Sequence, residues 1–509
     1  MSAIIDAVPG IEGPIKIDES LLKGKYVVAQ RDIMPGELVM EEKEPILSFS
    51  PNSVVNLNDS SDLTSAWFAG FVAVKTLTSP SKLEKILNLF GPVEGLSGEN
   101  LRGLARTMYM IVPGSTLRKP FSEEDVELFV KVSSILKFNA FQNEGNWLLF
   151  DYITRLSHSC AANCVYHIDG EVCRCFAAKL IKTGEEVTIA YNASRDLEPT
   201  HERRHKYLER KEFTCHCLRC DAIGDDTRQF DCVDPACKGV MMVHQPINKE
   251  RLRGTDVTYT GVEYVEPHLL PCTVCHRAAP AEYQSKILAL ETEMPSLAAR
   301  FEAEQQRCLA DLHTPADTWE ALVQQIDRCK LPRRHMLMKP ILDVQLSALT
   351  ILAHYKQVKN QRHRVALQRI ELMQNIFPYP HREVVNAIFE ACALCGCASP
   401  AGKAALTLHE EKALLQKALR MHLILNGREN RRISEDNALT KILSQLPMPQ
   451  QPQSQNMDTC AFCEESPVRA AMKRSRCGKC KQVIYCSLGC QKAHWPLHKK
   501  TCTPDPFFN

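Results

Sequence analysis

The stretch that decides the fold runs over residues 148–168 and reads LLFDYITRLSHSCAANCVYHI. A second stretch, KTGEEVTIAYN, follows at residues 182–192. They make up most of residues 146–191, where short apolar runs alternate with turn residues, a pattern that predicts short strands. We therefore expect the centre of the protein to be a β core.

Residues 21–50 also read as strands, and Pro35-Gly36 within them predicts a hairpin-like turn. The region between the two strand-rich parts, residues 62–138, reads as mostly helical. Apolar side chains recur there at three- and four-residue spacing, as in Leu83, Ile86, Leu87 and Phe90.

Downstream of the core, residues 211–280 are interrupted by cysteines and lack helical periodicity. The pattern then becomes helical again as far as Leu446. Two stripes illustrate it, Leu342, Leu346, Leu349 and Ala353, and Val365, Ile370, Met373 and Ile376. The Pro/Gln-rich stretch QLPMPQQPQSQN at residues 445–456 cannot build a core and predicts a linker.

Length and composition limit the possible classes of protein. A chain of 509 residues predicts three or four domains at roughly 150 residues each. The formal net charge of +2 predicts no general attraction to nucleic acid or to an anionic membrane, and direct nucleic-acid binding is not expected. No apolar run approaches the ~20 residues of a membrane span. Because no secretory signal is visible, we expect the protein in the nucleus and/or the cytoplasm. We also expect it to be a monomer.

The 23 cysteines are the unusual feature of the composition. In a reducing compartment disulfides are not expected, and metal thiolates become the leading interpretation. Cysteines outside the clusters described below are expected to be buried thiols; these are Cys164, Cys173, Cys175, Cys308, Cys329, Cys392, Cys395 and Cys397.

The last cysteine cluster has the spacing of a double zinc site. Two ligands spaced by two to four residues form one half of a tetrahedral site, and four such pairs predict two structural zinc ions. A module this small cannot bury enough apolar surface to fold alone, so metal binding must supply the folding free energy. The eight ligand candidates are Cys460, Cys463, Cys477, Cys480, Cys486, Cys490, His498 and Cys502.

This stretch, with YCSLGCQKAHWPLHKKTC at residues 485–502, resembles a MYND zinc finger. The resemblance implies two interleaved sites and binding of proline-containing peptides from protein partners. One zinc would take Cys460, Cys463, Cys486 and Cys490, and the other Cys477, Cys480, His498 and Cys502.

The central stretches resemble the paired signatures of SET-domain lysine methyltransferases. Residues 157–163 (SHSCAAN) stand where the family has Asn-His-Ser-Cys-x-Pro-Asn, and residues 184–191 (GEEVTIAY) match its Gly-Glu-Glu-x-Thr-Ile-x-Tyr. Residues 139–141 (NAF) and 213–220 (FTCHCLRC) match two further elements of the family. The resemblance implies S-adenosylmethionine as cofactor and protein lysine side chains as substrates.

The resemblance also implies roles for individual residues. The hydroxyl of Tyr191 would orient the lysine amine or the methyl group, in a channel that favours the neutral amine. The residues implied to bind the cofactor are Lys25, Asn139, Thr154, Ser157, His158 and Phe213. A post-SET zinc would take Cys160, Cys215, Cys217 and Cys220.

Four positions depart from the SET pattern and weaken the expectation of cofactor binding. Tyr26 stands where the family has glycine, Ser157 where it has asparagine, and Ala162 where it has proline. Lys211 stands where an aromatic residue often lines the lysine channel.

A further cysteine set, Cys232, Cys237, Cys272 and Cys275, has the spacing of a ribbon-like structural zinc; the alternative is buried cysteines without metal. It resembles an insertion in arthropod SET and MYND proteins. By contrast, His201-Glu202-Arg203-Arg204-His205 fits a metalloprotease pattern. We interpret this match as coincidence, because it lies in a charged helix and has no third ligand.

The sequence thus predicts an α+β protein with a SET-domain β core, a helical insertion, post-SET and ribbon-like zinc sites, an α-helical C-terminal domain and a C-terminal MYND finger. It resembles SET and MYND domain methyltransferases, close to the arthropod SmydA type. We expect a protein-lysine N-methyltransferase acting on histone or other lysines, with four zinc ions; the alternative is a non-catalytic adaptor. The expected boundaries are 15–196 (SET, insertion about 60–138), 197–221 (post-SET), 222–284 (ribbon), 285–444 (helical), 445–457 (linker) and 460–502 (finger).

Overall fold

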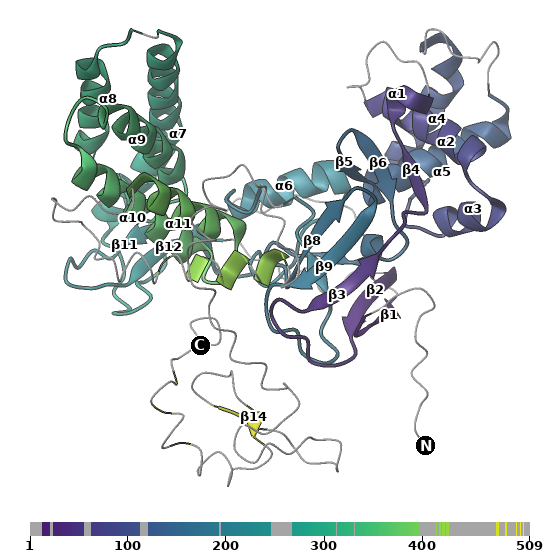
Figure 1. The fold of residues 1–509 in the computed structure, drawn as a ribbon, viewed down its shortest axis with the longest axis horizontal. Coiled ribbons are helices and arrows are strands. Elements are labelled where there is room, and N and C mark those ends of the chain that lie inside the picture. The colour runs from purple at the N-terminus through teal and green to yellow at the C-terminus, as the bar shows by residue number, and fades with distance from the viewer. Residues whose placement is uncertain are drawn as a thin grey trace. The chain divides into compact units, whose positions relative to one another are not determined.

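The computed structural model describes most of the chain up to residue 395 and scattered positions beyond residue 413 (Figure 1). The continuous ranges are 13–20, 24–54, 63–111, 121–192, 195–245, 267–311, 313–329 and 331–395. The chain divides into two compact units. The first comprises residues 1–304, 327–341 and 424–428, and the second residues 305–326, 342–423 and 429–509.

Small sheets form the β core of the first unit. A hairpin pairs β1 (Ile15–Ser20) with β2 (Gly24–Ala29). One three-stranded sheet has the order β3-β9-β8, from Leu38–Glu42, Val172–Ala177 and Cys164–Asp169. The other has the order β4-β6-β5, from Leu47–Phe49, Asn146–Leu149 and Phe141–Asn143. These strands other than β4 turn apolar side chains to a shared core, which includes Val27, Val39, Leu148, Cys175 and Ile189.

The two signature stretches meet in this core. The short strands β7 (Ser157–His158) and β10 (Thr188–Ile189) pair in parallel. Asn163 reinforces the pairing, because its Oδ1 accepts from the backbone N of Thr188 at 2.8 Å and its Nδ2 donates to Glu186 O at 2.8 Å. Residues about 30 positions apart are thereby held side by side.

The turn at Pro35-Gly36 forms, but the hairpin expected around it does not. Gly36 adopts the positive φ of 80° that a turn demands, a conformation that glycine adopts at little cost. The strands on either side then pair elsewhere, β2 with β1 and β3 with β9. The turn predicts a reversal of direction, whereas the choice of partner depends on which apolar faces the distant strands can cover.

A helical insertion separates β4 from β5, as predicted. Its helices are α1 (Pro51–Val54), α2 (Leu63–Leu77), α3 (Pro80–Leu87), α4 (Gly95–Ile111) and α5 (Glu123–Asn139). The hydroxyls of Ser79 and Ser122 cap α3 and α5 by accepting backbone N–H groups at their N-termini. Of the predicted stripe, Ile86 is fully buried, whereas Phe90 lies beyond α3 and is 66% exposed.

The short 3-10 helix η1 (Ile153–Arg155) lies within the core, between β6 and β7. Between the core and the later helices lie α6 (Thr200–Lys211) and a two-stranded ribbon of β11 (Gly224–Asp231) and β12 (Val240–His244). The long helix α7 (Ala281–Ala310) follows the ribbon. Arg228 on β11 joins both carboxylate oxygens of Glu291 on α7, at 2.5 and 2.7 Å, which ties the ribbon to the helix.

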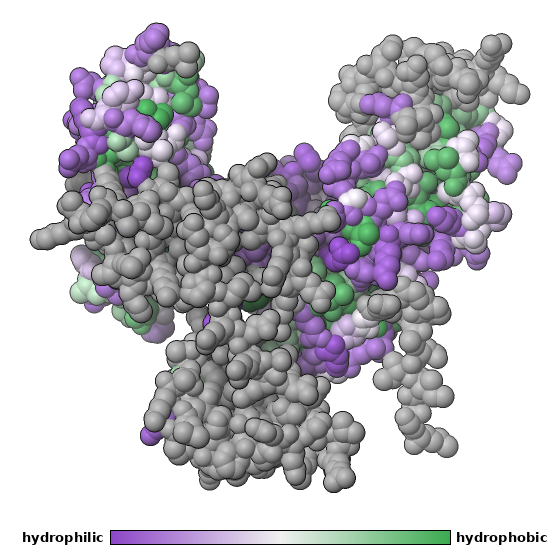
Figure 2. Space-filling view, in the orientation of Figure 1, coloured by the Kyte–Doolittle hydropathy of each residue, from purple (hydrophilic) through white to green (hydrophobic). Residues whose placement is uncertain are grey.

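Between residues 313 and 395 the described elements are helical: α8 (Ala316–Arg328), α9 (Met338–Leu352), α10 (Lys359–Ile376) and α11 (Arg382–Cys395). The predicted stripes are buried, except that Ala353 lies past the end of α9. On the face shown in Figure 2, the surface over α8 and α9 is mostly hydrophilic, with scattered apolar residues.

Little of the finger is described. The short strands β13 (Ser475–Arg476) and β14 (Ile484–Tyr485) pair antiparallel. The predicted linker at residues 445–457 and most finger ligands lie outside the described residues. Among the described helices, none combines the length and the apolarity needed to cross a membrane.

Candidate active site and zinc centres

A cavity of about 240 Å³ opens beside the paired signature strands. It brings together three predicted site residues, Asn139, Thr154 and Tyr191, and also Lys211. The remaining lining residues are mostly apolar or aromatic: Phe138, Ala140, Phe141, Gln142, Ile153, Tyr166, Ile168 and Ile189. A small cavity with a few convergent polar groups is the usual form of a small-molecule site.

Tyr191 lies two residues after the end of β10 and donates its hydroxyl hydrogen to Leu156 O at 2.9 Å. Its backbone N donates to Nδ1 of His158 at 3.2 Å, so the ring is held from both ends. Burial raises the pKa of Tyr191 to about 12, and the phenol stays neutral at physiological pH. Because the hydroxyl proton is already donated, the oxygen lone pairs are what this residue offers to a ligand.

The side-chain donors of Asn139 and Thr154 are also used in hydrogen bonds to backbone carbonyl oxygens. Nδ2 of Asn139 donates to Phe90 O at 2.6 Å and to Ile135 O at 2.8 Å. The Thr154 hydroxyl lies 3.1 Å from Phe150 O and 3.2 Å from Asp151 O, both acceptors. With these donors committed, the oxygen atoms of both side chains remain as acceptors. Together with Tyr191 they supply acceptors rather than donors, which suits a cationic ligand.

A buried carboxylate that the sequence did not single out positions η1. Glu42, 7% exposed on β3, accepts the backbone N–H groups of Asp151 and Tyr152 at 3.0 Å and of Ile153 at 2.7 Å. Burial nevertheless raises the pKa of this carboxyl. Nothing in the pattern of residues 38–42 signals the role, because it depends on a segment about 110 positions away.

Lys211 is the one predicted departure that reaches the cavity. It is the last residue of α6, and its Nζ donates to Lys137 O at 2.8 Å and to Phe138 O at 3.1 Å. The same Nζ lies 5.9 Å from the centre of the Tyr191 ring. Burial lowers the pKa of Lys211 to about 8, with a smaller contribution from the charge on Lys137.

The other predicted cofactor residues do not line the cavity. The ring of His158 packs against Tyr207, Tyr191 and Phe213, with ring centres 4.2, 5.2 and 5.8 Å away. Burial lowers the pKa of His158 to about 4, so the ring is neutral. Ser157 precedes it on β7, and Lys25 lies exposed on β2. Cofactor binding by these four residues therefore stays a prediction.

The post-SET cysteines converge on one point. The Sγ atoms of Cys160, Cys215, Cys217 and Cys220 all lie within 4.8 Å of one another. Cys160 Sγ is 3.9 Å from Cys215 Sγ and 3.5 Å from Cys220 Sγ. Zn–S bonds of about 2.3 Å at tetrahedral angles place sulfurs roughly 3.8 Å apart. The four residues fit a structural zinc, with Cys160 as the distant fourth ligand.

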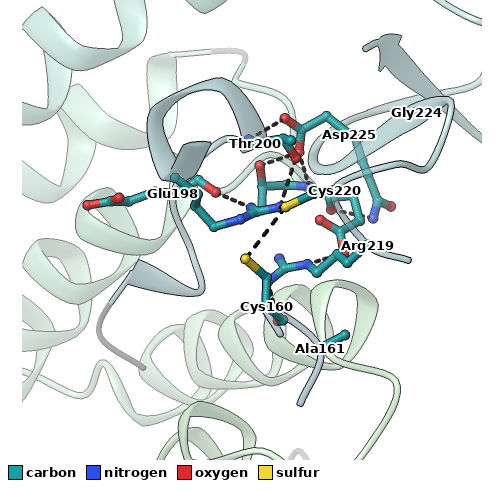
Figure 3. Close-up of polar contacts among 12 residues, drawn as sticks. Cys160, Ala161, Glu198, Thr200, Arg219, Cys220, Gly224 and Asp225 are labelled. Carbon is teal, nitrogen blue, oxygen red and sulfur yellow. Dashed lines mark hydrogen bonds and ion pairs between the residues drawn. The ribbon is translucent and has the colours of Figure 1, made fainter. Parts of the chain in front are cut away.

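A fully buried guanidinium supports this centre (Figure 3). Arg203 on α6 donates to Cys220 Sγ at 3.7 Å, to Thr200 Oγ1 at 2.8 Å, and to Glu198 O. A zinc with four thiolates carries a formal charge of −2, so a buried cation beside a ligand sulfur offsets it. Within the metalloprotease-like pattern, His201 and His205 are both exposed, and Arg203 has the structural role.

The ribbon cysteines form a second cluster. The Sγ atoms of Cys232, Cys237, Cys272 and Cys275 lie within 4.8 Å of one another, with Cys232–Cys275 at 3.6 Å and Cys237–Cys272 at 3.7 Å. Backbone N–H groups of Asp234, Gly239 and Val274 point at ligand sulfurs at 3.4–3.5 Å. Such N–H donors stabilise thiolates. These residues also fit a structural zinc.

In the finger, Cys477 and Cys502 are buried and their Sγ atoms are 3.7 Å apart. The resemblance places this pair in one site; the side chains of the other six ligands are outside the described set. The remaining predicted buried thiols, Cys164, Cys173, Cys175 and Cys308, are at most 5% exposed, and Cys329 is half-buried. No disulfide joins the cysteines whose side chains are described, and the side chains of Cys392, Cys395 and Cys397 lie outside that set.

Comparison with known proteins defines the class. The SET domain model matches residues 24–192, and the MYND finger model residues 460–502. Mouse histone-lysine N-methyltransferase SMYD3 is 31% identical over 170 residues, which are 31% of this chain and 39% of that protein. Human N-lysine methyltransferase SMYD2 is 57% identical over 30 residues, 6% of this chain and 7% of that protein.

Two further matches complete the comparison. SET domain and MYND-type zinc finger protein 6 of Schizosaccharomyces pombe is 52% identical over 44 residues, 9% of this chain and 8% of that protein. A structure of Rubisco LSMT bound to AdoMet is 13% identical, with 86% of this chain and 95% of that one covered. The TM-score of this match is 0.28.

This is an α+β protein that contains a SET domain and a C-terminal MYND finger. More particularly, segments of it are similar in sequence to the SMYD methyltransferases. The matched segments span well under half the length of these relatives, 39% at most.

Proposed function

We propose that this chain is an S-adenosylmethionine-dependent protein-lysine N-methyltransferase of the arthropod SmydA type. The observation that carries the proposal is the Tyr191 hydroxyl, committed as a donor to Leu156 O beside a cavity that Asn139 and Thr154 also line. The matched SET model and the homologous methyltransferases support it.

The oxygen acceptors suit this cofactor, which when bound supplies an electrophilic methyl group on a cationic sulfonium. The oxygens of Asn139 and Thr154 would accept from its ammonium group or contact its positive charge. The Tyr191 oxygen would accept a hydrogen from the substrate amine and so align the nitrogen lone pair for in-line attack. The aromatic lining, including Phe141 and Tyr166, would keep water out and favour the neutral amine.

The finger extends the proposal to protein partners. We propose that it recruits proteins through proline-containing peptides, because an extended ligand of that type loses little conformational entropy on binding. Histone or other protein lysines would be the substrates, and the protein would act as a monomer in the nucleus and/or the cytoplasm, with four zinc ions.

One observation favours a second candidate, a non-catalytic adaptor. The amine of Lys211 lines the same cavity and places a cation where a cationic cofactor would bind. If that charge abolished cofactor binding, the SET domain would serve as a scaffold and the finger alone would carry the function.

The test is calorimetric titration of S-adenosylmethionine into the full-length protein, followed by methyl transfer to histones and to lysate proteins. We expect binding, and about fivefold weaker binding in Thr154→Val, which removes one cavity oxygen. The matched control is Thr76→Val, because the Thr76 hydroxyl also donates to a carbonyl four residues earlier, at 2.8 Å, but lies exposed on α2. Absence of binding in the wild type would favour the adaptor.

A further inference from the structure

The Lys211 side chain is built into the cavity. Its Nζ is fixed by two carbonyls at the end of α5, Lys137 O and Phe138 O, and it faces the Tyr191 ring. A side chain held by two hydrogen bonds cannot simply swing into solvent without breaking both. A cation is therefore part of the cavity wall, opposed to the oxygen acceptors of Asn139, Thr154 and Tyr191.

The charged and titratable groups around this amine are few. On α5, Lys137 contributes a second positive charge, which pairs with Glu212 at the end of α6. Tyr191 is a neutral phenol, and His158 contacts that phenol rather than the amine. No carboxylate is described as an ion-pair partner of Lys211. Because burial holds its pKa at about 8, Lys211 changes charge close to physiological pH.

We propose that Lys211 is a specificity-determining residue that makes this cavity discriminate between the sulfonium cofactor S-adenosylmethionine and its neutral sulfide product S-adenosylhomocysteine. The inference rests on the proposed function, since it concerns the same cavity. A cation fixed in the wall of a partly buried cavity repels a second cation bound in the same cavity strongly enough to change affinity tenfold or more. The neutral product escapes this repulsion.

The sign of the pH dependence follows. Below pH 8 Lys211 is charged, S-adenosylmethionine is repelled, and the product is favoured. Above pH 8 the amine is neutral, its two hydrogens still reach the two carbonyls, and the repulsion is gone. By linkage, binding of the sulfonium expels a proton from Lys211, whereas binding of the sulfide does not.

The experiment compares the dissociation constants of the two ligands in the full-length zinc-loaded protein at about pH 6.5 and about pH 9.5. The measured quantity is the ratio of the two constants, S-adenosylmethionine over S-adenosylhomocysteine. In the wild type it should fall about tenfold as pH rises. Lys211→Met should give the low ratio at both pH values, and Lys211→Arg, which stays charged, the high ratio at both.

The matched control is Lys75→Met, which removes an exposed lysine on α2 that pairs with Asp125. Its ratio and pH dependence should equal those of the wild type, and the ligands' own titrations cancel in the comparison. Zinc content and melting temperature verify that each variant is folded.

The possible results distinguish a wrong role for Lys211 from a failure of cofactor binding itself. If both ligands bind but the ratio is the same at both pH values and in all variants, the inference on Lys211 is wrong and the proposed function stands. If neither ligand binds to any variant, including Lys211→Met, cofactor binding itself fails and both ideas are overturned. If Lys211→Arg follows the wild-type pH profile, a different group is titrating and Lys211 is not the determinant.

Discussion

Tyr191 shows how a single hydroxyl acquires a defined chemical role. Its proton is donated to Leu156 O and its ring packs on His158, so both the direction and the protonation of the oxygen are fixed. We expect Tyr191→Phe to lower methyl transfer by about 10²-fold or more, because alignment of the amine is lost while the ring that packs is retained. Initial rates with a radiolabelled methyl donor provide the measurement.

Tyr207→Phe is the matched control for that variant. Tyr207 is also buried and also packs on His158, but its hydroxyl has no hydrogen-bond partner among the described residues and it does not line the cavity. Removing an unpaired buried hydroxyl should leave activity unchanged and stability equal or higher. Equal rates in both variants and the wild type would make Tyr191 a structural residue.

Residues also differ in how readily their roles can be predicted from the sequence. Tyr191, Asn139 and Thr154 could be found because their motifs carry them to one cavity. Glu42 and Arg203 could not, since a glutamate in a strand and an arginine in a charged helix look ordinary until their distant partners are placed. Lys211 could be recognised as a departure from the SET pattern, but the direction of its amine depends on the carbonyls of α5.

At the scale of elements, α5 holds the loop that follows α3. Three of its side chains donate to successive carbonyls, Asn139 to Phe90 O, Lys131 to Gly91 O and Ser134 to Pro92 O. The periodicity of residues 62–138 predicted helices here but not this contact, because hydrogen bonds from a helix to a distant loop leave no periodic signal.

The ribbon is tightest where its strands meet the metal ligands. A Cβ at Gly239 would overlap Cys272 Sγ and lie 2.9 Å from Val274 Cβ. We expect Gly239→Ala to displace a ligand, weaken metal binding by about 10–100-fold and lower the zinc content by about one ion. Metal analysis after dialysis against a mild chelator is the measurement.

Gly103→Ala provides the comparison within the same chain. Gly103 is an exposed helical residue of α4, and nothing lies within 4 Å of the position of an added Cβ. Alanine there should leave the zinc content unchanged and stabilise the protein by about 0.5–1 kcal/mol. If Gly239→Ala behaves like Gly103→Ala, the ribbon site holds no tightly bound metal.

For the whole molecule, the metal content is the simplest quantity to predict. Two described clusters each fit one zinc, and the finger ligands predict two more. Protein purified without added metal should contain close to four zinc ions by elemental analysis. A content of two or fewer would remove the ribbon site and at least one other.

The finger should also behave as a separate module. It has its own metal ligands and therefore its own source of folding free energy. We expect residues 457–509 to fold alone in the presence of zinc and to bind an extended proline-containing peptide, observed by NMR. Residues 1–445 should keep whatever cofactor affinity the full chain has; its loss would make the finger integral to the SET domain.

Cys160 follows β7, whereas the three sulfurs it joins lie in a segment that begins 55 residues later. On the ribosome, the first ligand thus emerges well before the others, and the long loop between them must close before the tetrahedral set is complete. The set of four ligands therefore cannot be complete until Cys220, 60 residues after Cys160, has been synthesised. The segment around Phe213, which packs against Tyr191, is anchored by this metal site. We therefore expect the zinc supply during synthesis to set the fraction of newly made protein in which this segment is folded.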